Sequence, residues 1–290
     1  MRANEWKLHR KTLDFREGPA IMAIVNVTPD SFSDGGQFFA QDAALERCRS
    51  ALAQGATILD IGGESTSSWR PGAAFVSADE ETSRVVPVIQ ALRQESDAII
   101  SVDTTRARVA AEALQAGADI INDISGLKRD TELASVIARY DAGVCIMHSL
   151  GDASTMHADF DYAPDYSDLD AWLAAQVAYA QSQGIAKDRI CVDPGFGFSK
   201  SLDQNYDVAA RLDAMVDKGL PVLVGISRKR MIRAKTGDDP YAAELGTSAF
   251  NTYAALCGAQ ILRVHDVPAA VAAARVTQAI REAHERRGQR

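Results

Sequence analysis

The sequence predicts an α/β fold in which eight parallel strands, each followed by a helix, close into one barrel. Eight short runs of residues are apolar almost throughout, which predicts strands buried on both faces of a parallel sheet. Each run ends on a polar or charged residue, and a stretch with helical spacing follows each one. These observations together predict a single (β/α)8 TIM barrel, whose reactive groups collect at the C-terminal ends of the strands.

The eight predicted strands are defined by their sequences. They are IMAIVN at 21–26, ATILDIGGE at 56–64, IISVD at 99–103, ADIIND at 118–123, GVCIMH at 143–148, RICVD at 189–193, PVLVGIS at 221–227 and QILRVHD at 260–266. The polar terminators, from Asn26 in the first run to Asp266 in the last, are therefore expected to meet at one end of the barrel.

Helices are predicted between the strands, at 42–54, 79–94, 106–115, 131–140, 169–182, 206–216, 242–258 and 268–284. In the first of them Leu45, Cys48 and Leu52 recur at the spacing of one helix face. Thr105 is expected to cap the third helix, and Asp266 the eighth.

Long loops are expected on one side of the barrel only. Residues 28–41, 65–77, 149–167 and 196–205 all follow strands, whereas the loops that precede strands, such as 54–56 and 116–118, are short. Since long loops in a compact domain are usually functional or mobile, they mark the same face as the polar terminators.

Composition limits the classes of protein and partner. Of the 290 residues 47% are hydrophobic and 24% charged, so we expect one domain over 1–290, with a barrel core at about 20–284. A formal net charge of −8 argues against nucleic acid or a membrane surface as partner, because phosphate groups require a basic face. No targeting or membrane-spanning segment is recognisable, which leads us to expect a cytoplasmic protein.

The four cysteines are expected to be reduced core residues. Cys48, Cys145, Cys191 and Cys257 lack the paired spacing of a zinc site or a redox motif.

Three strands end on side chains that suit the edge of a nitrogen heterocycle. Asp103, Asn122 and Asp193 would point into the barrel mouth, where little water is available. Because a buried carboxylate is costly unless it meets hydrogen-bond donors, these residues predict a ligand with several N–H groups. The alternative is that they bind the backbone of neighbouring loops.

Basic residues are expected at the same mouth. Arg70, Lys229, Arg263 and His265 would bring at least three positive charges together in an acidic protein. Arginine suits phosphate oxygens through its planar fork, and lysine supplies a compact charge. The cluster predicts an anionic substrate or leaving group, with solvated surface charge as the alternative.

Further candidates lie in the loops and beside the strands. Phe198, in the glycine-rich segment DPGFGFSK at 193–200, could cover a flat ligand or pack in the core, and Met147 is expected to pack under the ligand. The segment NVTPDSFSDGG at 26–36 could approach a phosphate or metal, or could only satisfy its own backbone. His148 and His265 lack a third ligand of the expected kind, so a histidine-based metal site is not predicted.

Taken in order, these segments resemble the dihydropteroate synthase family of the folate pathway. The matching segments are NVTPDSFSDGG at 26–36, DIGGEST at 60–66, RPGA at 70–73, SVDT at 101–104, IINDISG at 120–126, MH at 147–148, DPGFGFSK at 193–200, GISRK at 225–229 and RVHDV at 263–267. They extend over the chain from about residue 20 to residue 284, and several are long and specific to the family.

The resemblance implies a TIM-barrel transferase that condenses 6-hydroxymethyl-7,8-dihydropterin diphosphate with para-aminobenzoate. The products would be 7,8-dihydropteroate and diphosphate. The resemblance also implies Mg²⁺ as cofactor, a homodimer, and inhibition by sulfonamides.

The matching motifs also imply the roles of individual residues. The pterin would be bound by Asp103, Asn122, Asp193, Lys229, Arg263 and Met147, and the diphosphate by Asn26, Arg70, Arg263 and His265. The aminobenzoate pocket would be formed by Thr66, Pro71, Phe198, Lys229 and Arg230, with Asn26 placing Mg²⁺ and with Asp103, Asp193, Lys229 and Arg70 as the catalytic residues.

These roles fit an SN1-like substitution. Loss of diphosphate leaves positive charge on a methylene conjugated to the pterin, which Asp103 and Asp193 would stabilise. Closure of the loops 28–36 and 65–72 would exclude water, which would otherwise compete for the cation.

The sequence leaves two other functions open. A pterin-binding methyltransferase, which passes a methyl group from a reduced folate to a corrinoid protein, would share the Asp and Asn contacts but has no need of the SRK and RVHD cluster. A non-catalytic paralogue that binds pterin would not need every catalytic position, and all of them are present here.

Two departures from the usual family pattern lie near the implied aminobenzoate pocket. Ser67, Ser68 and Trp69 stand between Thr66 and Arg70, where the family commonly runs GESTRPG. They are either a tolerated loop extension or a change in the access of aminobenzoate relative to bulkier sulfonamides. Arg230 follows SRK where many relatives carry Ser, and it could bind the aminobenzoate carboxylate or point to solvent.

Deletion of Ser67, Ser68 and Trp69 tests whether the extension affects inhibitor access. If it does, the shortened enzyme will show a changed inhibition constant for a sulfonamide relative to the KM for aminobenzoate. An unchanged ratio would mean that the extension is merely tolerated.

Overall fold

The predicted barrel is confirmed by eight parallel strands in the computed structural model, which describes residues 2–27, 36–64, 76–152 and 154–288. The strands are β3 (Ala20–Asn26), β4 (Ile58–Gly62), β5 (Ile99–Asp103), β6 (Ile120–Asp123), β7 (Gly143–Met147), β8 (Ile190–Asp193), β9 (Leu223–Val224) and β10 (Ile261–Val264). Their order is β8-β7-β6-β5-β4-β3-β10-β9, and a parallel bridge between Val192 and Val222 links the two end strands. The sheet therefore closes on itself.

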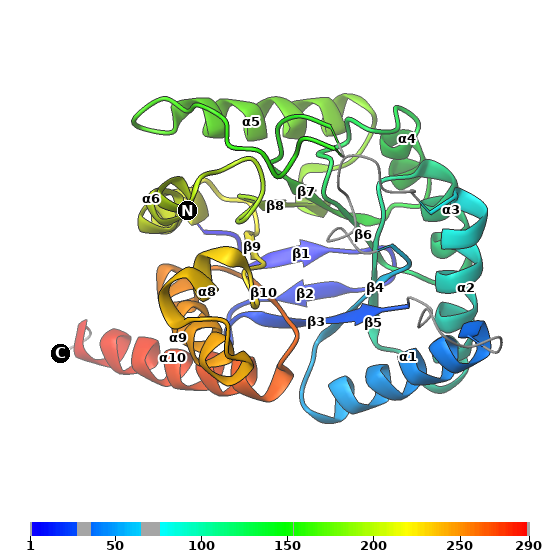
Figure 1. The fold of residues 1–290 in the computed structure, drawn as a ribbon, viewed down its shortest axis with the longest axis horizontal. Helices are drawn as coiled ribbons and strands as arrows, with labels where there is room; N and C mark the ends of the chain where they lie inside the picture. Colours follow the sequence, from blue (N-terminus) through cyan, green and yellow to red (C-terminus); the bar gives the residue numbers. More distant parts are fainter. Residues whose placement is uncertain (1, 28–35, 65–75, 153, 289–290) are drawn as a thin grey trace.

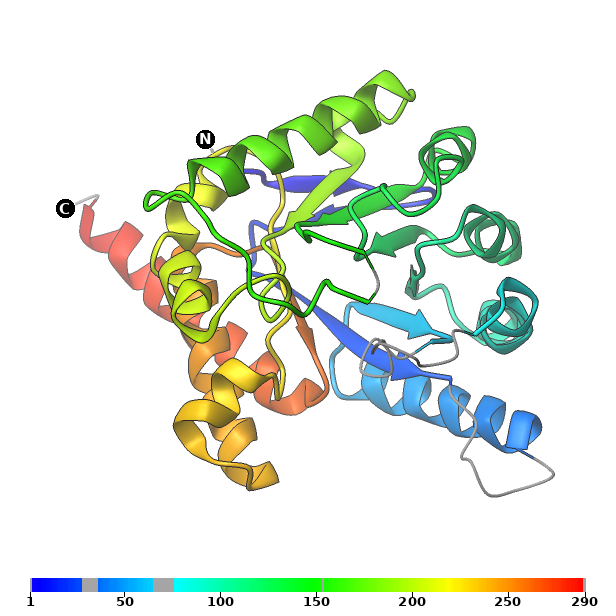
Figure 2. The same ribbon diagram turned by 45° about the horizontal axis from the view of Figure 1, so that its top comes forward.

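Helices surround the barrel as a ring (Figure 1). They are α1 (Gly36–Ala53), α2 (Ala78–Glu95), α3 (Ala107–Ala116), α4 (Leu133–Arg139), α5 (Ser167–Ser182), α6 (Leu202–Ala210), α7 (Leu212–Val216), α8 (Arg230–Thr236), α9 (Pro240–Cys257) and α10 (Val267–Gly288). Figure 2 shows the same ring tilted, with the strands enclosed by it. The main core lies between the strands and these helices, as expected for strands buried on both faces.

The interior of the barrel changes from apolar to polar along the strands. At the N-terminal ends, inward-facing residues such as Met22, Ile58 and Ile120 form an apolar layer. Further along, the register places Asp60 beside Ser101 and Asp103 beside Asn122 on neighbouring strands. Since inward positions alternate along a strand, the same strands supply both the apolar floor and the polar mouth.

A hairpin that was not predicted from the sequence covers the N-terminal end, or floor, of the barrel. Strands β1 (Glu5–Lys7) and β2 (Thr12–Asp14) pair antiparallel and lie across the centre of the ring in Figure 1. Trp6 and Leu13 pack against the apolar layer, and the Trp6 indole nitrogen donates a hydrogen bond to the Arg189 carbonyl oxygen at 2.8 Å. Each strand has three residues with only the middle one buried, which is too short a pattern to predict a strand.

A buried carboxylate joins this hairpin to the floor. Asp119 is fully buried, and its oxygens accept hydrogen bonds from Arg10 Nε at 2.9 Å and from an Arg93 guanidinium nitrogen at 2.7 Å. The backbone N–H of Ile100 donates to the same carboxylate at 3.0 Å. Asp119 therefore fastens the hairpin turn, α2 and β5 to one another.

The predicted strand over 221–227 is wrong in its C-terminal half. Strand β9 ends at Val224, because the chain then turns through Arg228, which has a positive φ of 57°. The Lys229 N–H donates to the Ile226 carbonyl oxygen at 3.0 Å, and α8, which was not predicted, begins at Arg230.

Two other boundaries differ from the prediction. The helix predicted over 206–216 begins earlier, at Leu202, where Ser201 and Gln204 form a capping box, and it breaks at Arg211 into α6 and α7. The first helix likewise begins at Gly36 rather than at 42.

One predicted helix cap is wrong and the other is confirmed. The Thr105 hydroxyl accepts a hydrogen bond from Arg129, while Asp130 Oδ2 accepts one from Ala107 N at 2.8 Å at the start of α3. Asp266 Oδ1 accepts from Ala269 N at 3.0 Å, as predicted for the last helix.

Two further findings bear on the sequence predictions. None of the helices in the described ranges is both apolar enough and long enough to reach across a lipid bilayer. The four cysteines are free, with Cys48, Cys145 and Cys191 buried and Cys257 partly buried.

Replacement of Trp6 by Ala tests how far the hairpin stabilises the barrel. Because the side chain is fully buried, we expect the free energy of unfolding to fall by about 3–5 kcal/mol, measured by urea denaturation. Trp6→Phe keeps most of the apolar contact and should cost less. A loss below about 1 kcal/mol for Trp6→Ala would show that the hairpin contributes little to stability.

Candidate active site

Five strands bring polar side chains together at the mouth of the barrel. Asp60 lies on β4, Asp103 on β5, Asn122 on β6, Asp193 on β8 and Arg263 on β10. Arg263 Nε donates to Asp60 Oδ2 at 2.6 Å, and a terminal guanidinium nitrogen donates to Asp103 Oδ2 at 2.7 Å. Asn122 Nδ2 donates to the same Asp60 oxygen at 3.1 Å. Asp60, Asp103, Asn122 and Arg263 thus form one hydrogen-bonded group at the C-terminal ends of their strands, as the barrel prediction required.

The two carboxylates keep Arg263 charged. Burial alone would lower the pKa of the guanidinium, but Asp60 and Asp103 outweigh that effect and raise the pKa above its ordinary value. Burial raises the pKa of Asp103, and Arg263 opposes that rise. The two carboxylates therefore depend on Arg263, since its removal would leave both of them without their cation.

Asp193 is a second buried carboxylate at the mouth, at the end of β8. Its side chain is buried, and Oδ1 accepts a hydrogen bond from Gly195 N at 2.7 Å. Burial raises its pKa, while Lys229 is the largest opposing influence. Because the hydrogen bond from the described residues goes to Oδ1, Oδ2 is available to a ligand N–H.

Lys229 lies between Asp193 and an aromatic ring. Its ammonium donates to the Phe196 carbonyl oxygen at 2.6 Å and lies 4.4 Å from the centroid of the Phe198 ring. Burial lowers the pKa of Lys229 to about 8, against the attraction of Asp193. An ammonium has three N–H groups, so Lys229 can donate to a ligand while it retains Phe196.

A second buried lysine, Lys200, binds the loop that follows β8. The Lys200 ammonium contacts the carbonyl oxygens of Gly195 at 3.2 Å and Phe198 at 3.1 Å, and His148 Nδ1 at 3.1 Å. Burial lowers the pKa of Lys200 to about 7 and that of His148 to about 2. His148 is therefore a neutral acceptor inside the protein.

Phe198 forms an apolar wall beside these charges. It packs in a small cluster with Ile124, Met147 and Met156, and all four side chains are buried. The exposed ring of His157 stacks on Phe198 with centroids 5.0 Å apart. Met147 therefore packs in the same cluster as the Phe198 ring, for which the sequence left open either a flat ligand or the core as partner.

His265 lies at the opposite rim. Its Nδ1 atom is 2.9 Å from the Ser227 hydroxyl, which also accepts from the His265 backbone N–H at 3.3 Å. Burial, followed by the neighbouring arginines, lowers the pKa of His265 to about 4. Near pH 7 the imidazole can therefore act as a hydrogen-bonding group, and the predicted three or more positive charges would come from Arg70, Lys229 and Arg263.

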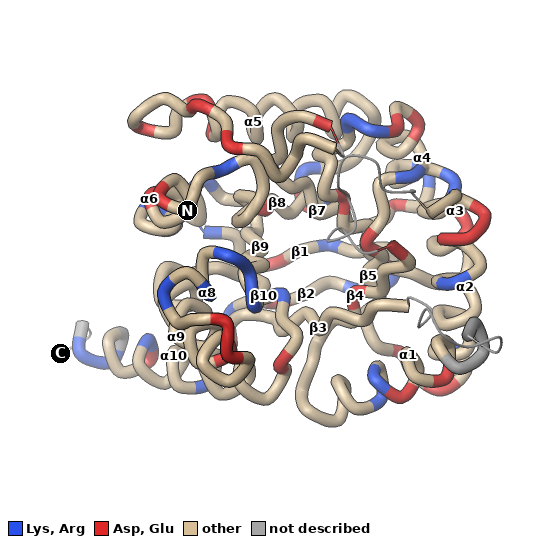
Figure 3. Tube along the Cα trace, in the orientation of Figure 1, with Lys and Arg blue, Asp and Glu red and all other residues tan. Residues whose placement is uncertain are grey.

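The remaining predicted residues lie at the edge of the mouth or outside the described chain. Asn26 is exposed at the end of β3, and Arg230 is exposed at the first position of α8. Thr66, Arg70, Pro71 and the insertion 67–69 lie outside the described residues. Figure 3 shows basic and acidic residues mixed around the barrel, with a basic run at the start of α8 that includes Lys229 and Arg230.

Three polar residues of this region were not selected from the sequence. Asp60 and Ser227 were noted as strand terminators without a role, and Lys200 was quoted only as the end of the motif at 193–200. Asp60 and Ser227 share one signal, a polar side chain inside or at the end of an apolar run, which becomes informative once burial is known, whereas Lys200 lies between two serines and carries no such signal.

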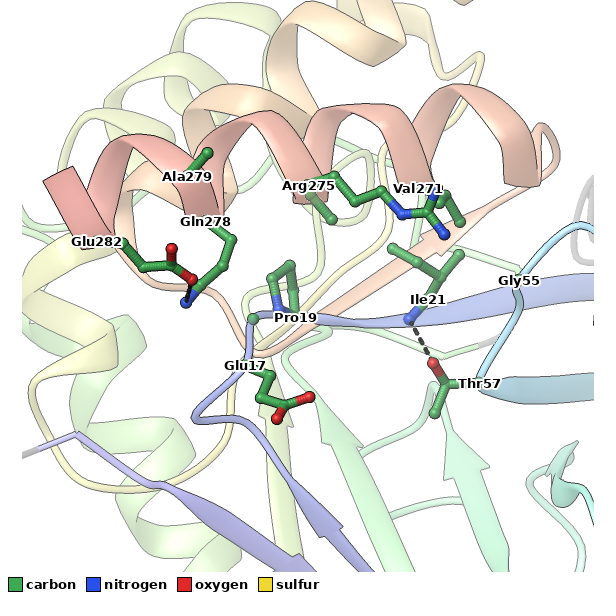
Figure 4. A pocket seen from close by; sticks show the side chains of 12 residues that line it. Glu17, Pro19, Ile21, Gly55, Thr57, Val271, Arg275, Gln278, Ala279 and Glu282 are labelled. Atoms are coloured by element: carbon green, nitrogen blue, oxygen red, sulfur yellow. Dashed lines mark hydrogen bonds between the residues drawn. The ribbon is translucent and has the colours of Figure 1, made fainter.

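A groove of about 330 Å³ elsewhere on the surface is not the site. It lies between the segment before β3 and helix α10, and Glu17, Thr57 and Arg275 are among its lining residues (Figure 4). This is the N-terminal end of β3, whereas the predicted residues gather at the C-terminal ends of the strands. Reactive groups in such a barrel lie at the latter end.

Comparison with known proteins identifies the family to which the chain belongs. A family model described as pterin binding enzyme matches residues 22–265. A dihydropteroate synthase from Synechocystis sp. is 43% identical over 268 residues, which cover 92% of each chain. The chain belongs to the dihydropteroate synthase family. It is therefore a transferase.

Solved structures of dihydropteroate synthases share this fold. The enzyme from Yersinia pestis, solved in complex with a sulfonamide drug, matches with a TM-score of 0.87 and 41% identity, covering 96% of this chain and 99% of that one. The enzyme from Burkholderia cenocepacia, complexed with 7,8-dihydropteroate, matches with a TM-score of 0.86 and 38% identity, covering 99% of each chain.

The pKa of Lys229 predicts the alkaline limb of the pH dependence of this transferase. A lysine is charged below its pKa, so the ammonium at the mouth should be lost as pH rises through about 8. We expect kcat/KM to fall by up to about tenfold per pH unit above that value. Lys229→Arg keeps a charge over this range and should move the falling limb to higher pH, whereas an unchanged limb in this variant would exclude Lys229 as its origin.

Proposed function

We propose that this mouth condenses 6-hydroxymethyl-7,8-dihydropterin diphosphate with para-aminobenzoate, to give 7,8-dihydropteroate and diphosphate. The observation that carries the proposal is the hydrogen-bonded group of Asp60, Asp103, Asn122 and Arg263, together with the buried carboxylate of Asp193, whose pKa is influenced by Lys229 and Arg263. Acceptors for a heterocycle and cations for a phosphate tail are thus combined in one small space. The Burkholderia relative, which covers the whole barrel, was solved with 7,8-dihydropteroate bound.

The pterin would bind by its hydrogen-bonding edge to the acidic side of the mouth. Asp193 Oδ2, Asn122 and Asp103 offer acceptors for ring N–H and amino groups, and Lys229 offers donors for a ring oxygen or nitrogen. Arg263 is fixed by two carboxylates, so its planar group can lie against the flat ring without a change of position.

The diphosphate would bind on the basic side, near Arg263 and His265 together with Arg70 from the loop outside the described residues. The Ser227 hydroxyl holds the His265 imidazole in place, so its other nitrogen can meet a phosphate oxygen. No group of three or more acidic, histidine or cysteine side chains in the described ranges could hold a metal ion. Magnesium commonly binds through few protein ligands plus substrate phosphates and water, which fits Asn26 alone at the rim; when bound, Mg²⁺ would neutralise charge on the diphosphate.

The aminobenzoate would lie against Phe198 and Lys229. The buried ring gives an apolar surface to the aromatic acid, and the ammonium 4.4 Å from the ring centroid meets its polar end. Thr66 and Pro71 would complete the pocket from the second long loop. Arg230 is exposed at the start of α8, where a guanidinium can reach a carboxylate at the edge of the pocket.

The reaction would proceed as an SN1-like substitution. The bond between the pterin methylene and the diphosphate oxygen breaks, and its electron pair leaves with the diphosphate. The resulting cation is stabilised by the negative charges of Asp193 and Asp103, which are held in place before the reaction begins. The amine nitrogen of aminobenzoate then forms the new C–N bond and releases one proton.

We also propose a homodimer formed through α9 and α10. The large hydrophobic side chains that are exposed in the described chain all lie on these two helices: Tyr241, Leu245, Tyr253, Leu256, Val276 and Ile280. Apolar patches of this kind commonly mark contact surfaces. The free cysteines fit a reducing compartment such as the cytoplasm, where we propose that the enzyme works.

Substitutions on these helices test the proposed dimer. Leu245→Glu combined with Ile280→Glu places two charges in the apolar face and should convert a dimer to a monomer in analytical ultracentrifugation. Ala174→Glu, at an exposed position of α5, is the control and should leave the mass unchanged. A monomeric unmodified protein would contradict the proposal.

The proposed reaction is tested by an assay with purified protein, Mg²⁺, the pterin diphosphate and aminobenzoate. We expect dihydropteroate by mass spectrometry, and its loss when EDTA removes the metal. In the same assay Asp193→Asn should lower kcat by about 100-fold or more, because one charge that stabilises the cation is gone. Binding of inorganic diphosphate, measured by calorimetry, should change far less.

Two outcomes would count against these assignments. Failure of the unmodified protein to form dihydropteroate would reject the function. Equal losses of turnover and diphosphate binding in Asp193→Asn would reject only the role given to Asp193.

A further inference from the structure

We propose that Asp60 is a positioning residue that orients Asn122 and Arg263 for the pterin. The inference rests on the proposed function and adds to it a residue that does not itself need to touch the substrate. Its basis is one buried carboxylate oxygen that serves two functional side chains at once.

The contacts of Asp60 cross the inside of the barrel. In the sheet order β6-β5-β4-β3-β10, one strand separates Asp60 on β4 from Asn122 on β6, and one separates it from Arg263 on β10. Asp60 Oδ2 nevertheless accepts from Asn122 Nδ2 at 3.1 Å and from Arg263 Nε at 2.6 Å. The side chain of Asp60 has no solvent exposure, so these bonds are made without competition from bulk water.

The chemistry of the Asp60 side chain then decides which way the Asn122 amide faces. An ionised carboxylate carries no hydrogen and can only accept, so the Asn122 amide must turn its nitrogen toward Asp60. Because the amide group is planar, its oxygen lies on the other side, away from Asp60. Asn122 therefore offers the ligand an acceptor, like Asp103 and Asp193 on the neighbouring rim.

Arg263 is held by the same oxygen. Its Nε atom is bound to Asp60 and a terminal nitrogen to Asp103, which fixes the guanidinium plane at two points. If Asp60 were absent, the guanidinium could rotate about its remaining bond, and the Asn122 amide could reverse. Both changes would weaken pterin binding without removing a group that contacts the pterin.

The chain supplies a matched control at the opposite end of the barrel. Asp119 is also fully buried and also accepts from arginines, Arg10 and Arg93, but it lies at the floor. Asp60→Ala and Asp119→Ala therefore both remove a buried carboxylate that is paired with arginine. Only the first does so beside the proposed pterin site.

The experiment measures binding of 6-hydroxymethyl-7,8-dihydropterin diphosphate by calorimetry, the KM for aminobenzoate, and the melting temperature of each variant. Asp60→Ala should weaken pterin binding by about 10- to 100-fold, the effect of losing hydrogen bonds between charged groups. The KM for aminobenzoate should change by less than about threefold. Asp60→Asn preserves an acceptor oxygen in the same volume, so it should retain more affinity than Asp60→Ala and remain folded if the latter does not.

A double-mutant cycle of Asp60 and Asn122 distinguishes a positioning role of Asp60 from a merely structural one. If Asp60 acts through Asn122, the double variant Asp60→Ala/Asn122→Ala should lose less affinity than the product of the two single losses. Asp119→Ala should lower the melting temperature and leave pterin affinity unchanged.

Three results would overturn the inference. The first is a pterin affinity in Asp60→Ala equal to that of the unmodified protein. The second is a loss of the same size in Asp119→Ala, which would reduce the effect to general destabilisation. The third is full multiplication of the Asp60 and Asn122 losses. Failure of the unmodified protein to bind the pterin diphosphate would instead reject the proposed function, and this inference with it.

Discussion

The burial of the Arg263 guanidinium between Asp60 and Asp103 is the constraint on which the mouth of the barrel depends. A cation that is largely withdrawn from water is tolerated only with partners at hydrogen-bonding distance; of its two carboxylate partners Asp60 is fully buried and Asp103 partly buried, and both need donors. Asn122 completes the group by donating to Asp60. The residues are mutually necessary, so the mouth behaves as one electrostatic unit rather than as a set of separate contacts.

The loop after β8 extends this unit to the aromatic side. The Lys229 ammonium donates a hydrogen bond to the Phe196 carbonyl oxygen, and the Lys200 ammonium donates to those of Gly195 and Phe198. The two ammonium groups together bind three carbonyl oxygens of the loop, and that of Lys229 also lies over the Phe198 ring. Positive φ values at Gly195 and Gly197, 70° and 80°, allow the loop to bend sharply enough for both contacts.

Much of the architecture could be predicted from the sequence, and the reasons for the failures are physical. The continuous apolar runs of β3 to β8 predict buried parallel strands, and their terminators predict one site. The role of Asp60 could not be predicted, because its partners lie 62 and 203 residues away and meet only when the barrel closes. Nor could the hairpin, since three-residue strands show no usable period. The lowered pKa of His265 likewise depends first on its burial, which the sequence does not reveal.

The residues just before the floor hairpin are held at the closed end of the barrel. Arg2 pairs with Asp217 at 2.8 Å, and the Ala3 carbonyl accepts from Gln260, just before β10. The first residues are thus held at the end of the barrel remote from Asp193 and Arg263. An affinity tag or surface tether attached to these residues would extend from the closed end of the barrel. An enzyme immobilised through it would keep the open end, which carries the candidate site, facing the solution.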